Sequence, residues 1–121
     1  MNIYSEIVLE HYKNPHNYGS ISKANKKTVL FNPSCGDRIE MEAVFTKKKL
    51  EEIKFRGQGC AISIASASML TDYVKNKANE DLQKLDKEFM IKMLGINLGP
   101  SRIKCALLPL EALHNLINSK S

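Results

Sequence analysis

The feature that most constrains the fold is a segment of alternating apolar and polar residues in the first half of the chain. Within residues 38–46, every second position from Ile39 onward is apolar: Ile39, Met41, Ala43 and Phe45. The positions between them include Arg38, Glu40 and Glu42. Successive side chains of a strand point to opposite faces, so this period of two predicts a half-buried antiparallel strand.

The neighbouring segments extend this strand into a sheet. The three lysines at residues 47–49 predict a turn, and residues 50–56 predict a returning strand that faces the core with Ile53 and Phe55. Residues 28–31 predict a further strand, which is followed by a loop containing Pro33 and Gly36. Together these segments predict a three-stranded antiparallel meander.

Helical periodicity predicts the rest of the secondary structure, at residues 2–13, 60–77, 88–94 and 102–118. The first helix should end before Pro15, the third should be capped by Gly95, and Ser101 should be the N-cap of the last. Pro109 lacks a backbone donor and predicts a kink or a break in that helix. We therefore expect an α+β fold, a three-stranded antiparallel sheet packed by helices, with an N-terminal and a C-terminal helix.

Length and composition limit the classes of protein to consider. The 121 residues predict a single domain, 1–121, and 43% hydrophobic residues are enough for a packed core. No apolar run approaches the roughly 18 residues that span a bilayer, and the N-terminal segment carries glutamates where a signal peptide would be basic and apolar. We therefore expect a cytoplasmic protein with no membrane partner. The net charge of +5 comes from lysines interleaved with acidic residues, which predicts a solvated surface and no nucleic-acid partner.

The three cysteines are the candidates for chemistry. An odd number excludes a complete set of internal disulfides, and the expected compartment is reducing. Cys35 lies in a predicted loop, whereas Cys60 and Cys105 lie near predicted helix N-termini, where unpaired amides favour a thiolate. Asp37 adds a carboxylate close to Cys35, and three thiolates with one carboxylate make the four ligands of a tetrahedral zinc site.

Other interpretations of the same residues remain open at this point. Free cysteines are often simply buried, and the spacing of these three matches no compact zinc finger. A cysteine–histidine hydrolase would need a nearby imidazole, yet His11, His16 and His114 adjoin no cysteine and are typical of surface or helix-packing positions. The glycines at 57 and 59 lack the full fingerprint and the lysine of a phosphate loop. A small basic binding module is the remaining alternative.

Four motifs carry a resemblance to a known family: EHYKNPHN at residues 10–17, NPSCGDRI at 32–39, GQGCAIS at 57–63 and RIKCA at 102–106. In this order, over nearly the whole chain, they resemble the U-type iron–sulfur assembly family, which comprises IscU, SufU and the N-terminal domain of NifU. The resemblance implies an α+β domain that acts as a scaffold or sulfur acceptor, and it leaves open whether the protein is itself an enzyme. It also implies two kinds of partner: a pyridoxal-phosphate cysteine desulfurase that donates persulfide sulfur, and recipient apo iron–sulfur proteins.

The resemblance also assigns roles to residues. It implies that Cys35, Asp37, Cys60 and Cys105 bind zinc or a nascent [2Fe-2S] cluster, and that Cys105 is the persulfide acceptor. Lys104 stands where the IscU branch has a histidine, so the last motif resembles the SufU branch, although the chain between Cys60 and Cys105 is too short for the insertion typical of SufU. Two functions therefore stay open: a scaffold that assembles the cluster, and a zinc-dependent sulfurtransferase-like acceptor that does not build one.

Overall fold

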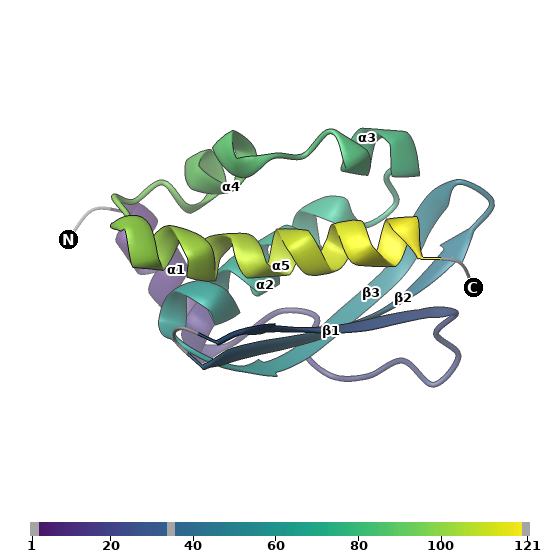
Figure 1. Ribbon diagram of the computed structural model, residues 1–121, viewed down its shortest axis with the longest axis horizontal. Coiled ribbons are helices and arrows are strands. Elements are labelled where there is room, and N and C mark those ends of the chain that lie inside the picture. Colours follow the sequence, from purple (N-terminus) through teal and green to yellow (C-terminus); the bar gives the residue numbers. More distant parts are fainter. Residues whose placement is uncertain (1–2, 34–35, 120–121) are drawn as a thin grey trace.

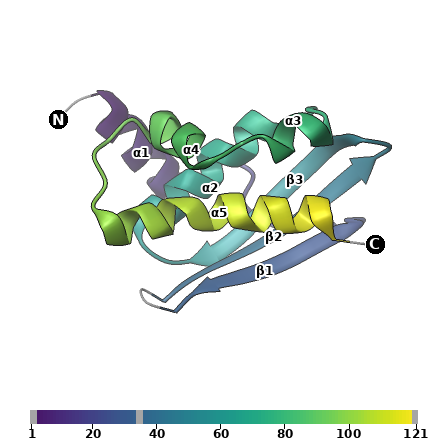
Figure 2. The same cartoon turned by 45° about the horizontal axis from the view of Figure 1, so that its top comes forward.

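The computed structural model describes residues 3–33 and 36–119 of the chain. The elements follow in the order α1 (Ile3–Lys13), β1 (Lys26–Asn32), β2 (Asp37–Thr46), β3 (Lys49–Gln58), α2 (Ala61–Val74), α3 (Asn79–Gln83), α4 (Lys87–Leu94) and α5 (Pro100–Asn118). The strands form one antiparallel sheet in the order β1-β2-β3, as predicted. Helices α2 and α5 lie against one face of the sheet, and α1, α3 and α4 lie around them (Figures 1 and 2).

The alternation in β2 places the core on the helical side of the sheet. Ile39, Met41 and Ala43 are fully buried, and Met41 pairs in register with Phe55 of β3, which is also fully buried. These side chains belong to one apolar cluster with residues of α2 and α5 such as Leu113. The prediction of a half-buried strand is therefore confirmed, because the apolar face of β2 packs against the helices.

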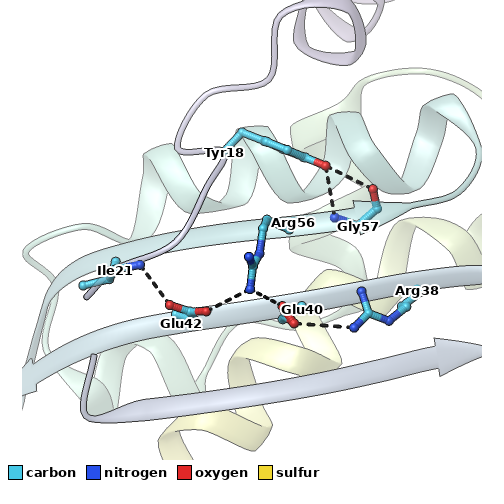
Figure 3. A network of polar contacts seen from close by, with 7 residues as sticks. All are labelled: Tyr18, Ile21, Arg38, Glu40, Glu42, Arg56 and Gly57. Carbon is cyan, nitrogen blue, oxygen red and sulfur yellow. Dashed lines mark hydrogen bonds and ion pairs between the residues drawn. The ribbon is translucent and has the colours of Figure 1, made fainter. Parts of the chain in front are cut away.

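The opposite face of the sheet holds a polar network that departs from the simple alternation (Figure 3). Glu42 is only 5% exposed, although the alternation in β2 predicted that its side chain would lie on the polar, solvent-facing side of the sheet. The connector between α1 and β1 crosses this face, and the backbone N–H of Ile21 donates to Glu42 Oε1 at 2.9 Å. Arg56 donates to Glu42 Oε2 at 3.2 Å and to Glu40 Oε2 at 2.5 Å. The carboxylate of Glu42 is thus covered and paired, because a loop remote in sequence packs over it.

The N-terminal and central helices meet through small side chains. Helix α1 ends at Lys13, as the following Asn14-Pro15 predicted, and packs its buried Val8 toward α2. Helix α2 buries a run of alanines and serines, which allows helix axes to approach closely. One of these residues, Ser66, donates from Oγ to the backbone carbonyl of Ala106 in α5 at 2.7 Å. No helix within the described residues is long and apolar enough to cross a membrane.

Some predicted helix boundaries are confirmed and others are wrong. Helix α4 ends at Gly95, which takes the left-handed conformation (φ 68°), as predicted. The short helix α3 lies in a segment that carried no helical prediction, and its buried Leu82 anchors it to the core. The N-cap of α5 is Gly99 and not Ser101, because Pro100 occupies the first turn. Helix α5 also continues through Pro109 without a break, since packing along its buried face outweighs the missing donor.

Candidate metal centre

Three of the four predicted ligand residues come together at one end of the sheet. Asp37 is the first residue of β2, Cys60 immediately precedes α2, and Cys105 lies in the second turn of α5. One ligand atom from each residue lies within 4.8 Å of the other two. The fourth predicted ligand, Cys35, falls outside the described residues. The fold therefore gathers into one cluster three donors that are widely separated in the sequence.

The Asp37 carboxylate is held in this cluster by the start of α2. Asp37 is only 1% exposed, and its Oδ1 accepts a hydrogen bond from the backbone N–H of Cys60 at 3.0 Å. Amides at a helix N-terminus carry partial positive charge and are otherwise unpaired, so they suit a carboxylate. This contact aims the aspartate toward Cys60, with which it would share an ion.

Gly59, a glycine from which the sequence predicts a close approach of the backbone to the ion, makes this contact with Asp37 possible. A Cβ atom at Gly59 would lie 2.4 Å from Asp37 Oδ1 and 2.6 Å from Ser63 Oγ, far inside van der Waals contact. Ser63 is fully buried and donates from its hydroxyl to the carbonyl of Cys60 at 3.1 Å. The sequence shows that Gly59 precedes Cys60. The sequence does not show that Gly59 contacts Asp37, because this contact depends on how β2 packs against the start of α2.

The two described cysteines have different surroundings. Cys60 is the N-cap residue of α2 and is half-buried, as expected for a residue at a helix N-terminus. Cys105 is only 3% exposed and lies in an apolar cluster that includes Val8 and Leu94. Since α5 begins at Pro100, Cys105 lies beyond the first turn, and the prediction that the helix N-terminus would favour its thiolate is wrong.

The chemistry of these donors fits zinc or iron. Thiolate sulfur suits zinc and iron–sulfur clusters, and a carboxylate is a common further ligand of zinc. A tetrahedral ion with bonds of about 2.3 Å holds two sulfur atoms roughly 3.8 Å apart, so the observed spacing, within 4.8 Å, requires only small movements. Burial of the Cys105 thiolate costs hydration free energy, and a bound cation would compensate its charge.

Comparison with known proteins identifies the family. The NifU-like N-terminal domain family matches residues 3–119. The chain belongs to this family. This result confirms the resemblance seen in the four motifs. The three-stranded antiparallel sheet and the N-terminal and C-terminal helices of this chain are those predicted from the sequence.

The relatives of this NifU-like domain are described as two kinds of protein, a sulfurtransferase and a cluster assembly scaffold. It is 38% identical over 130 residues to the zinc-dependent sulfurtransferase SufU of Bacillus subtilis, with 92% of this chain and 86% of the relative covered. It is 35% identical over 132 residues to the iron–sulfur cluster assembly scaffold protein IscU of Streptococcus pyogenes, with 95% and 82% covered.

A solved structure agrees with these relatives. The crystal structure described as a putative iron–sulfur cluster assembly scaffold protein for the SUF system, from Fervidobacterium islandicum, superposes with a TM-score of 0.82. It is 28% identical to this chain, and the match covers 96% of this chain and 97% of the other.

Proposed function

We propose that this NifU-like domain is an iron–sulfur cluster assembly scaffold that accepts sulfur from a cysteine desulfurase and passes a [2Fe-2S] cluster to recipient apoproteins. Its cluster is held by Cys35, Asp37, Cys60 and Cys105, and the same residues hold zinc when no cluster is present. Cys105 is the persulfide acceptor. The protein acts beside the desulfurase and is not itself an enzyme.

The observation that carries this proposal is the convergence of Asp37, Cys60 and Cys105 in a chain of this family. Cys35 is the fourth ligand of this proposal because it matches the first of the family's three cysteines and stands two positions before Asp37 in the sequence. Three sulfur donors favour a cluster, whereas the single carboxylate is the weakest partner for it. Asp37 is accordingly the exchangeable ligand that cluster release needs.

Sulfur transfer requires a thiolate at Cys105. This thiolate attacks the outer sulfur of the desulfurase persulfide, a new S–S bond forms on Cys105, and the cysteine thiolate of the desulfurase leaves with the electron pair. The exchange needs no external oxidant or reductant. Because Cys105 is only 3% exposed, docking of the desulfurase must uncover it before the attack.

A second candidate function is favoured by the relative from B. subtilis, which is named a zinc-dependent sulfurtransferase. In this case zinc is the resident metal, Cys105 takes sulfur from the desulfurase, and no cluster is built. Zinc would keep the thiolate deprotonated and protected until the partner docks.

Native mass spectrometry under anaerobic conditions separates the two candidates. The protein would be measured before and after incubation with a cysteine desulfurase, cysteine and ferrous iron. Replacement of zinc by two irons and two sulfides is the result expected of a scaffold. Zinc that is retained, with one added sulfur atom on the protein, would favour the acceptor. A protein that binds neither zinc nor iron would overturn both.

Variants test the individual residues. Asp37→Ala should lower zinc occupancy, while Asp81→Ala, at an exposed position of α3, should not. Unchanged metal content in Asp37→Ala would contradict both candidate functions. Cys105→Ser should abolish the added sulfur, whereas Cys60→Ser should still acquire it. Sulfur uptake by Cys105→Ser would remove the acceptor role from Cys105.

A further inference from the structure

A second group of metal-ligating side chains lies outside the candidate metal centre. His11 comes from α1, His16 from the connector after α1, and Asp72 from α2. One ligand atom of each lies within 4.8 Å of the other two. The rings of His11 and His16 are 4.4 Å apart between centroids, and His16 Nδ1 lies 2.5 Å from Asp72 Oδ2. Three segments of chain thus present two imidazoles and one carboxylate to the same point.

The side chains of His11 and Asp72 each have a further partner that orients them, and the backbone of His16 is held beside them. The Nδ1 atom of His11 is hydrogen-bonded to Ser68 Oγ at 2.6 Å, which leaves Nε2 as its nitrogen for an ion. The same hydroxyl accepts from the backbone N–H of His16 at 2.8 Å. Asn17 donates from Nδ2 to Asp72 Oδ1 at 2.9 Å. Such outer contacts hold metal ligands in place and are a regular part of protein metal sites.

The cluster is accessible and its chemistry suits a cation. The side chains of His16 and Asp72 are 49% and 43% exposed, so an ion can reach them from solvent. Both histidines also line a hollow of about 300 Å³, which leaves room for further ligands. Burial, together with the neighbouring His16, lowers the pKa of His11 and favours the neutral ring, which is the form that binds metals.

We propose that His11, His16 and Asp72 form a second metal site, which binds a divalent ion of the first transition row such as Zn²⁺. Imidazole and carboxylate are the donors that such borderline ions accept without sulfur. Asp72 follows Cys60 by twelve residues, and the helical rise over this distance is about 18 Å. The site therefore cannot share an ion with the centre formed by Asp37, Cys60 and Cys105. Its ion ties α1 and the connector to α2.

The test is the stoichiometry of zinc binding, measured by isothermal titration of the metal-free protein. The wild-type protein should bind one more equivalent of Zn²⁺ than His16→Gln or Asp72→Asn. The matched control is His114→Gln, because the imidazole of His114 contacts the carbonyl of Leu82 and lies outside the cluster. This control should retain the full stoichiometry. Zinc bound at the cysteine centre would contribute equally to the wild type and to the variants. The difference of one equivalent between them therefore reports the second site alone, whether or not the cysteine centre binds zinc.

Two further measurements exclude a merely structural effect of the variants. The metal-free melting temperature of His16→Gln should stay close to that of the wild type, since the side chain is half exposed. Added Zn²⁺ should raise the melting temperature of the wild type more than that of His16→Gln. In NMR spectra, the extra equivalent should shift the ring signals of His11 and His16 but not those of His114. Equal stoichiometry in wild type and His16→Gln, or unshifted ring signals, would overturn the proposal.

Discussion

The contact between Gly59 and Asp37 makes the sharpest prediction about the candidate metal centre. In Gly59→Ala, the new Cβ would lie 2.4 Å from Asp37 Oδ1, where ordinary contact begins near 3.4 Å. The carboxylate must therefore retreat by about 1 Å, the difference between these distances. Its hydrogen bond from the N–H of Cys60, now 3.0 Å, would then be lost. Gly59 does not have a positive φ, so the substitution acts through this clash and not through backbone strain.

The expected magnitudes follow from these contacts. Forcing a methyl group into a packed site costs about 1–3 kcal/mol, and this loss should appear in the free energy of unfolding of the metal-free protein. Losing an outer hydrogen bond that orients a metal ligand, here the bond from the N–H of Cys60 to Asp37, weakens metal binding by about 10–100-fold, or roughly 1.4–2.7 kcal/mol. Urea denaturation measures the first quantity, and competition with a chromophoric zinc chelator measures the second.

Gly99→Ala is the matched control for this substitution. A Cβ at Gly99 meets nothing within 4 Å, and its backbone is extended. Alanine is a poorer N-cap residue than glycine, which lowers the free energy of unfolding. Alanine also restricts the unfolded chain, which raises the free energy of unfolding by about 0.4–1 kcal/mol. The two effects oppose each other, so the net change in stability should be small. Zinc binding by Gly99→Ala should equal that of the wild type. Wild-type zinc affinity in Gly59→Ala would refute the reasoning that this contact holds Asp37 in the site.

The remaining predictions concern the stability of the metal-free protein, measured by urea denaturation. Asp86→Ala removes the acceptor of the Phe89 N–H at the start of α4 (2.9 Å) and should cost about 1 kcal/mol, whereas Asp86→Asn should cost only a few tenths. Glu42→Ala leaves the N–H of Ile21 without its acceptor and should cost about 1–3 kcal/mol. Phe55→Ala empties a fully buried position and should cost about 3–5 kcal/mol. Losses below about 0.5 kcal/mol in the last two would contradict the burial described for them.

Much of the fold was predictable because its signals are local. The alternation around Met41 identified β2, since side chains of a strand face opposite sides whatever packs on them. Asn14-Pro15 ended α1, and Gly95 ended α4, because both act on the backbone of their own segment. Helix α3 was missed because its five residues carry too little periodicity, and Leu82 holds it through a contact distant in sequence.

The sequence predicted which residues form the candidate site but not how those residues are arranged in space. The motifs around Asp37, Cys60 and Cys105 identified the family and these residues as candidate ligands, since both depend on residue types in order along the chain. Their convergence is a property of the folded chain, in which the start of β2 meets the ends of two helices.

Amino-acid order alone determined the strands, most helices and the family of this protein, because backbone preferences and side-chain periodicity act over a few residues. Only the tertiary structure decided the burial of Glu42, the need for Gly59 beside Asp37 and the meeting of His16 with Asp72. Each of these depends on two segments far apart in sequence, whose distance is set by the packing of helices on the sheet. Periodicity within one segment carries no information about that distance.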